Sequence, residues 1–254
     1  ILLVRDHLGI EPLYYHHSKQ KLIVAQSIGD ILQHLAKRPS YNHRVLSKMR
    51  TSWMDYTDET HYQGIYRVEP GHMMLFQSDG TAVKKAYWSL KKQGSTLYYK
   101  DDRDYVAHFA GLMDEALLSA VGQNAVHCAS EFSAGLDSSA IYCAAHHLGI
   151  YPTLFMNQPS PGTKYADTYN NTYEDAFLRH YRITKLHRIG AESFNPIEIF
   201  REYANWFAGP APYLFFMFSQ PLHSAVAKGE YPILLSGFGG DQCVSGQLPA
   251  NCFL

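Results

Sequence analysis

Residues 1–90 alternate short apolar runs with polar turn signals, a pattern typical of half-buried β-strands. The five runs that predict strands lie at 2–4, 12–15, 22–25, 64–68 and 73–76. Residues 28–35 predict a helix among them. The polar stretch 91–103, which includes a Gly-Ser pair, is typical of a surface linker. We therefore expect one domain at 1–90 and a second at 104–254.

The pattern changes after the linker to strands that alternate with helices. Apolar residues first recur at helical spacing, at 106, 109, 110, 113, 116, 117 and 120. Strands are predicted at 125–132, 153–156 and 231–235, and helices at 138–148, 173–181 and 219–227. Gly149 directly follows the second helix and provides the usual left-handed stop. This alternation predicts an α/β fold with a parallel, doubly wound sheet.

Composition narrows the class of protein. With 46% hydrophobic and 18% charged residues over 254 positions, the chain has material for globular domains. The 22 Lys and Arg nearly balance the 23 Asp and Glu, which argues against a nucleic-acid or anionic-membrane partner and favours a small-molecule or peptide substrate. No apolar run is long enough to span a membrane. The chain starts inside an expected strand without Met, so we expect a fragment.

The four cysteines have neither zinc-site spacing nor the density of a secreted disulfide scaffold. They stand at positions 128, 143, 243 and 252. A reducing, cytoplasmic location is therefore expected.

The sequence Ser-Ala-Gly-Leu-Asp-Ser-Ser at 133–139 carries the main chemical signal. It lies between an expected strand and helix, where free N–H groups, the helix dipole and small side chains form a cradle for phosphate. Asp137 would repel phosphate unless Mg²⁺ bridged them, so it is a candidate metal ligand. Asp241 follows the strand at 231–235, and parallel strands deliver such loops to one sheet edge. The two carboxylates are expected to share one ion.

Simpler interpretations stay open for both loops. The first is also compatible with an ordinary strand-to-helix turn with a serine cap, and Gly-Gly-Asp around Asp241 with a plain turn. A hydrolase with Ser133 as nucleophile is disfavoured, because Glu131 stands where the nucleophile elbow requires glycine.

Four segments together resemble the asparagine synthetase family. SAGLDSS at 133–139 is similar to the family's SGGLDSS, and SGFGGDQ at 236–242 to its SGEG(S/A)DE. VRDHLGIEPLYY at 4–15 resembles the strand-turn-strand that closes the family's glutamine amidotransferase domain, and VEPGH at 68–72 its PPGH turn. The resemblance implies a partial Ntn-hydrolase-type (αββα), β-rich domain at 1–90. It implies a truncated ATP-pyrophosphatase domain, of the adenine nucleotide alpha hydrolase type, at 104–254.

The resemblance also implies an activity and a set of site residues. Family members form amides from ATP through an acyl-adenylate, releasing AMP and pyrophosphate. Asp137 and Asp241 would bind Mg²⁺. The implied ATP-binding residues also include Asp137. Those for the pyrophosphate are Ser133, Gly135, Ser138 and Ser139, and those for the adenosine are Phe132, Met156, Ser236 and Gly237. The implied partners are a small-molecule or peptide carboxylate and an amine or ammonia donor, with glutamine as one source; a homodimer is compatible with the resemblance.

Two positions depart from the family pattern. Phe238 replaces a Glu, or the Tyr of the β-lactam-forming branch, and can neither move a proton nor accept a hydrogen bond. Gln242 replaces the terminal acid of the motif. The loss at 238 argues against plain asparagine synthesis and favours a peptide or secondary-metabolite substrate, as in relatives similar to lasso-peptide cyclases. It leaves the catalytic residues unassigned, and a non-catalytic nucleotide-binding or scaffold relative stays an alternative.

Overall fold

The computed structural model describes residues 1–18, 21–50, 57–89, 97–122, 127–158, 171–190, 195–209 and 216–243. The chain divides into two compact units, each with its own hydrophobic clusters. Unit 1 comprises Ile1–Thr96 and Pro196–Leu214, and unit 2 comprises Leu97–Asn195 and Phe215–Leu254. Residues 91–96 of the expected linker and residues 125–126 of an expected strand lie outside the described ranges.

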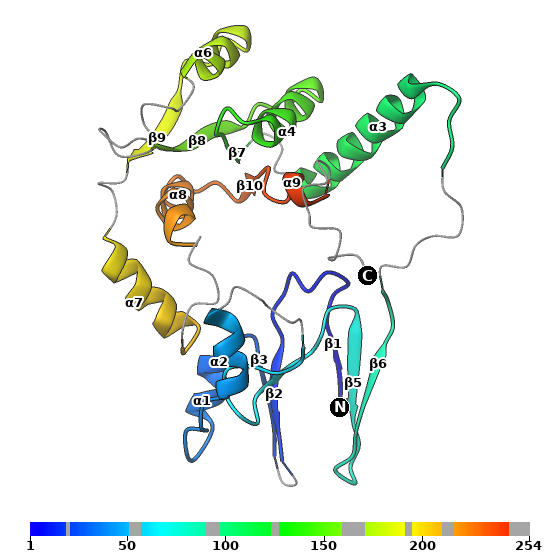
Figure 1. Ribbon diagram of the computed structural model, residues 1–254, viewed down its shortest axis with the longest axis vertical. Helices are drawn as coiled ribbons and strands as arrows, with labels where there is room; N and C mark the ends of the chain where they lie inside the picture. Colours follow the sequence, from blue (N-terminus) through cyan, green and yellow to red (C-terminus); the bar gives the residue numbers. More distant parts are fainter. Residues whose placement is uncertain are drawn as a thin grey trace. The chain divides into compact units, whose positions relative to one another are not determined.

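Unit 1 contains two antiparallel sheets of three strands each (Figure 1). The first has the order β1 (Leu2–Val4), β5 (His72–Phe76) and β6 (Ala82–Ala86). The second has the order β3 (Leu22–Ala25), β2 (Tyr14–His17) and β4 (Tyr66–Arg67). Alternate side chains of both sheets meet in one cluster that contains Leu3, Tyr15, Val68, Met74 and Phe76. The period-two pattern therefore predicted the β-rich character of this segment correctly.

The segment that follows β1 is a turn held by two charged side chains. Asp6 accepts hydrogen bonds from the amides of Ile10 at 2.8 Å and Glu11 at 3.0 Å, and these bonds lower the pKa of its carboxyl group. The Arg5 guanidinium donates to the carbonyls of Val68 at 2.8 Å and Gly9 at 2.7 Å. The Arg-Asp pair of this motif thus has a structural function, which is to fix the chain between β1 and β2.

The described residues of unit 1 include three helices. They are α1 (Ile28–Gln33), α2 (His43–Arg50) and α7 (Pro196–Trp206). Ser27 caps α1 by accepting a 3.0 Å hydrogen bond from the amide of Asp30. The buried residues Ile28, Ile31, Tyr62 and Ile65 form a second cluster, against which Ala208 packs after the end of α7. Residues from the second half of the sequence therefore complete the core of the first unit.

We expect Tyr62→Phe to lower the free energy of unfolding by about 1 to 2 kcal/mol. Tyr62 is buried, and its hydroxyl donates to the Ala208 carbonyl at 2.7 Å and accepts from Nε of Arg38 at 3.0 Å. Phenylalanine keeps the ring but leaves both partners without this hydroxyl. Urea denaturation measures the change, with Tyr66→Phe, at an exposed ring, as the matched control. Equal effects of the two substitutions would contradict this account.

Unit 2 is built on a four-stranded parallel sheet (Figure 1). Its order is β10 (Ile233–Leu235), β7 (Cys128–Glu131), β8 (Thr153–Gln158) and β9 (Leu186–Gly190). Every neighbouring pair of these strands is parallel. The predicted parallel sheet is therefore confirmed, and the strand β9 adds an element that the sequence pattern did not predict.

Helices cover both faces of this sheet. The helices are α3 (Asp102–Val121), α4 (Leu136–His147), α6 (Asn171–His180), α8 (Phe216–Lys228) and the short α9 (Gly240–Cys243). Cys128 of β7 packs with Leu117 of α3 and Ala145 of α4. The next residue, Ala129, points to the other face and packs with Leu222 and Val226 of α8. Because successive strand residues face opposite sides, a short apolar strand such as β7 is buried on both.

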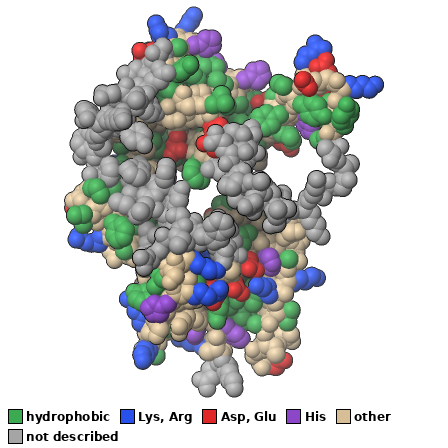
Figure 2. All heavy atoms as spheres, in the orientation of Figure 1, with side chains coloured by type: hydrophobic (Ala, Val, Ile, Leu, Met, Phe, Trp, Pro, Cys, Tyr) green, Lys and Arg blue, Asp and Glu red, His purple; other side chains and the backbone are tan. Residues whose placement is uncertain are grey.

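The apolar positions of α3 divide between core and surface. Leu117 and Val121 are buried, whereas Val106, Phe109 and Leu112 are exposed. Figure 2 shows hydrophobic side chains gathered on this part of the molecule. The helical spacing thus predicted the helix but not which part of it packs against the sheet. Among the described residues, no helix is long and apolar enough to cross a membrane.

Candidate nucleotide site

The loop between β7 and α4 carries the first motif. The amide of Phe132 still bonds to the carbonyl of Phe155 in β8, at 2.8 Å, so the loop leaves the sheet directly after that residue. Ser138 holds the loop from inside the helix: its hydroxyl accepts from the amide of Ser133 at 3.2 Å and donates to the carbonyl of Gly135 at 3.3 Å. Gly135 is the N-cap and makes no side-chain cap bond. The serine cap expected for an ordinary turn is therefore absent at that position.

The loop after β10 carries the second motif. Ser236 donates its hydroxyl proton to the carboxylate of Glu131, and its oxygen accepts from the amide of Phe238 at 3.1 Å. Gly239 has φ +95°, a conformation that favours glycine, and it turns the chain into α9. Because β10 pairs with β7 in parallel, both loops follow the same edge of the sheet, as the sequence predicted.

Two glycines bring these loops into contact. A Cβ atom built on Gly237 would lie 2.7 Å from the amide nitrogen of Ser138 and 2.8 Å from the carbonyl carbon of Asp137. One built on Gly240 would overlap the Asp137 carboxylate, with Oδ1 at 2.7 Å. The structure thus places the carboxylate of Asp137 against Gly240, the residue that precedes Asp241.

The residues expected to bind ATP and Mg²⁺ differ in their exposure to solvent. Ser133, Gly135 and Asp241 are exposed, whereas Ser138 is buried. Half-buried positions are Asp137, Ser139, Ser236 and Gly237. Phe238 is 81% exposed, although it is a large apolar side chain in the second loop. The side chain of Gln242 lies outside the described part of the structure.

Phe132 and Met156 have buried side chains. They are 2% and 1% exposed and pack with Tyr142 and Leu154 in one hydrophobic cluster. Their side chains therefore fill the core beneath the sheet edge. Nη1 of Arg188 lies 3.7 Å from the sulfur of Met156.

The residue Glu174 pairs with Arg188. Its carboxylate is almost fully buried and forms an ion pair and hydrogen bond with the Arg188 guanidinium. The partner of the Glu174 carboxylate, at the start of α6, is therefore an arginine of the neighbouring strand β9.

Glu131 is a residue that sequence reasoning considered only as a mismatch to the hydrolase motif. One carboxylate oxygen accepts from Ser236, and the other lies 3.4 Å from Nε2 of His223 in α8. These two contacts, with His223 the stronger influence, hold the pKa of Glu131 below its ordinary value although burial acts in the opposite direction. A glutamate at the carboxyl end of a core strand is a signal that could have marked this cluster.

The residues present are compatible with a bound magnesium ion. Among the described residues, no three His, Cys, Asp or Glu side chains gather into a metal site. Mg²⁺ is commonly held by only one or two carboxylates, with phosphate oxygens and water completing its shell. The pair Asp137 and Asp241 fits that mode and does not fit a metal cage made of protein ligands alone.

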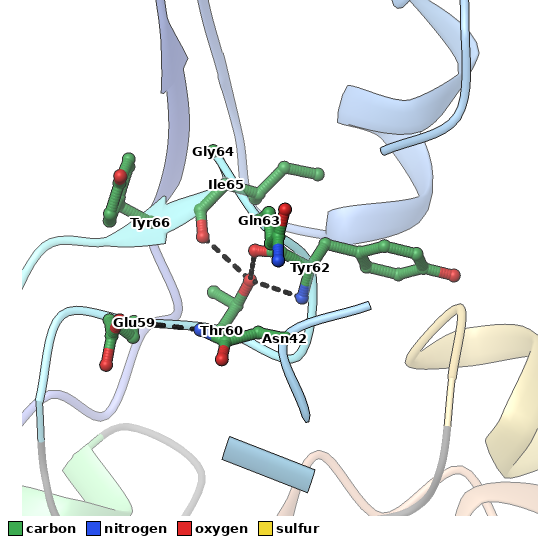
Figure 3. Close-up of a pocket in the computed structure, with 8 residues that line it drawn as sticks. All are labelled: Asn42, Glu59, Thr60, Tyr62, Gln63, Gly64, Ile65 and Tyr66. Carbon is green, nitrogen blue, oxygen red and sulfur yellow. Dashed lines mark hydrogen bonds between the residues drawn. The ribbon is translucent and has the colours of Figure 1, made fainter. Parts of the chain in front are cut away.

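The described pocket of unit 1 is a separate feature (Figure 3). Its volume is about 210 Å³, and its lining includes Asn42, Glu59 and Thr60. Thr60 Oγ1 donates to the carbonyl of Ile65 at 2.7 Å and accepts from the amide of Tyr62 at 3.2 Å, so the threonine organises the pocket wall. None of the expected ATP-binding residues lines this pocket.

Comparisons with known proteins match both units. The family model of a glutamine amidotransferase domain matches residues 1–88. Amidase chry2 of Gibberella zeae is 31% identical over 63% of this chain and 23% of its own length. Amidase chyE of Penicillium rubens is 32% identical over 36% of this chain and 13% of its own. Asparagine synthetase [glutamine-hydrolyzing] 2 of Bacillus subtilis is 22% identical over 97% of this chain and 34% of its own length.

The chain is asparagine-synthase-like. The family predicted from the four motifs is confirmed, because the amidotransferase match covers the two motifs of unit 1 and the Bacillus relative extends across nearly the whole sequence. This asparagine-synthase-like chain spans at most about a third of the length of the relatives it matches. It combines a glutamine amidotransferase-type domain with a mixed α/β unit built on a parallel sheet.

Proposed function

We propose that the protein forms amide bonds with ATP, through an acyl-adenylate, and releases AMP and pyrophosphate. The contact between the two glycine-containing loops is the observation that carries this proposal. Gly237 and Gly240 pack against the start of α4 and set the Asp137 carboxylate next to the Asp241 loop. An anion cradle and two acids at one sheet edge suit a magnesium-bound triphosphate.

Each loop has a distinct task in this proposal. Ser133, Gly135, Ser138 and Ser139 hold the pyrophosphate end of ATP through hydroxyls and backbone N–H groups. The adenosine lies along the backbone of Phe132 and Met156 and beside Ser236 and Gly237. Mg²⁺, held by Asp137 and Asp241, supplies neutralisation of the phosphate charge.

The reaction follows from this arrangement by positioning. A substrate carboxylate oxygen attacks the α-phosphorus, the bond to the bridging oxygen breaks, and pyrophosphate leaves with the electron pair. An amine or ammonia then attacks the acyl carbon and AMP leaves. The cradle residues contribute by holding the phosphates in line and by stabilising charge as it develops on pyrophosphate.

The relatives support an amide-forming or amidotransferase activity. Two are named amidases and one a glutamine-hydrolysing asparagine synthetase. With an amidotransferase-type domain at 1–88, we propose glutamine as a source of the ammonia. In this architecture residues 1–90 belong to an Ntn-type domain and 104–254, apart from the segment Pro196–Leu214 that packs in unit 1, to an ATP-pyrophosphatase domain. We also propose that the protein acts in the cytoplasm without nucleic-acid or membrane partners.

The exposed Phe238 bears on the substrate. An 81% exposed aromatic ring in the nucleotide loop offers apolar contact where an acid would offer charge. We propose a peptide or secondary-metabolite carboxylate in place of free aspartate. The same residue favours a second candidate function, a nucleotide-binding scaffold without catalysis, because the ring cannot transfer protons.

The test is a screen of the complete protein with ATP, Mg²⁺ and a panel of carboxylates that includes aspartate, other amino acids and short peptides. Hydroxylamine traps any acyl-adenylate as a hydroxamate. We expect hydroxamate, AMP and pyrophosphate in equal amounts with one class of carboxylate, and none when EDTA removes the metal. Tight ATP binding without any pyrophosphate release would favour the scaffold. Release of ADP and phosphate would contradict both.

A further inference from the structure

Glu131 joins three elements of unit 2 at the edge where the nucleotide loops lie. It is the last residue of β7, directly before the first loop. Ser236, the first residue after β10, donates its hydroxyl to one carboxylate oxygen. His223 of α8, on the opposite face of the sheet from α4, lies with Nε2 3.4 Å from the other oxygen. One carboxylate therefore orients an imidazole beside the proposed site.

The imidazole has a second nitrogen that the carboxylate does not use. Nε2 faces Glu131, and the His223 side chain is 48% exposed, so part of the ring is open to solvent. Within the described residues, no hydrogen bond to Nδ1 is formed. A histidine fixed through one nitrogen by a carboxylate, with the other nitrogen open, is the arrangement of a general base.

We propose that His223, oriented by Glu131, accepts the proton of the attacking amine in the amide-forming step. This inference rests on the proposed function. As the C–N bond forms, the bond between the acyl carbon and the AMP oxygen breaks, and AMP leaves with the electron pair. The proton lost from nitrogen passes to Nδ1, and the imidazolium is stabilised by the Glu131 carboxylate.

Other groups of the two loops are less suited to this step. The Ser236 hydroxyl donates a hydrogen bond to Glu131, and its oxygen accepts one from the Phe238 amide. Both oxygens of Glu131 have partners. In the proposed function Asp137 and Asp241 hold the metal ion, and Phe238 has no group that accepts a proton. His223 is the base that the geometry leaves available.

The test compares two nucleophiles in the complete protein, with the carboxylate found by the screen. Ammonium chloride supplies ammonia, whose nitrogen must lose a proton to a strong enough base after attack. Hydroxylamine gives a more acidic adduct that water can deprotonate. For His223→Asn we expect about a 100-fold loss of the ammonia-dependent rate. Hydroxamate formation and ATP–pyrophosphate exchange should stay within about twofold, since neither needs the base.

Two further variants sharpen the comparison. Glu131→Gln keeps a hydrogen-bonding side chain but loses the charge that stabilises imidazolium, so about a tenfold loss with ammonia alone is expected. His147→Asn, at an exposed histidine at the far end of α4, is the matched control and should change neither rate. Binding of MgATP, followed by calorimetry, reports whether each variant retains the folded nucleotide site.

The outcomes separate the two proposals. Selective loss with ammonia supports the base. Equal loss with both nucleophiles, or no loss with either, overturns it while leaving the proposed function standing. A wild-type protein that makes neither amide nor hydroxamate refutes the proposed function, and the role of His223 falls with it.

Discussion

Asp137→Asn is expected to reduce ATP-dependent pyrophosphate release about 1,000-fold, the kinetic equivalent of roughly 4 kcal/mol. Asparagine has nearly the same size, so the contact with Gly240 is retained. The charge that holds Mg²⁺ beside the phosphates is removed. The structure makes this an unusually clean substitution, because the Asp137 carboxylate already lies against the second loop.

Steady-state release of pyrophosphate, measured at increasing Mg²⁺, checks this prediction. Asp175→Asn in α6 is the control, since Asp175 is an exposed acid of the same unit and should leave the rate unchanged. If Asp137→Asn kept wild-type turnover with the same magnesium dependence, the assignment of Asp137 as a metal ligand would be wrong.

Gly237→Ala should lower the rate of ATP–pyrophosphate exchange at least about 100-fold, because displacing catalytic groups by about 1 Å lowers rates by about this factor. The added methyl group would meet backbone atoms of Ser138 and Asp137 at 2.7 and 2.8 Å. No side-chain rotation relieves an overlap with backbone, so the loop after β10 must move away from the start of α4. That movement would separate the two halves of the proposed site.

The matched control is Gly111→Ala in α3. Gly111 lies within a helix and a Cβ atom there meets nothing within 4 Å, so alanine should stabilise the fold by about 0.5 to 1 kcal/mol. Thermal unfolding of both variants distinguishes loss of the site from loss of the fold. Exchange at the wild-type rate by a folded Gly237→Ala protein would refute the close packing of the loops.

The structure and the relatives both indicate two parts, a glutamine amidotransferase-type domain and an α/β unit with a parallel sheet. The contacts of individual residues show how the motifs contribute to each part. The Arg5 and Asp6 motif shapes a turn in the amidotransferase-type domain, whereas in the α/β unit the loop at 133–139 packs against the glycines of the loop after β10. The contacts thus give the first motif a structural function, and the proposed function gives the other two motifs a chemical one.

Much of the fold could be predicted from local pattern. Alternation of side chains in β2 and β5 and helical spacing in α3 and α4 are properties of neighbouring residues, so they can be read along the chain. The parallel sheet then placed the loops of Asp137 and Asp241 at one edge. In contrast, α7 was not predicted, and its docking into unit 1 depends on Tyr62 and Ala208, which lie 146 positions apart.

By itself, the sequence determined many of the strands and helices, the two loops and their resemblance to one family, but not β9 or α7. Tertiary structure alone decided that Phe132 and Met156 are buried, that Gly237 touches Ser138, and that Glu131 binds Ser236 from 105 positions away. The physical reason is the separation along the sequence of the residues that determine each property. Hydrophobic periodicity is set by neighbours along the backbone. Burial and pairing are set by which distant strands and helices pack together, and a single sequence does not encode that choice in any local pattern.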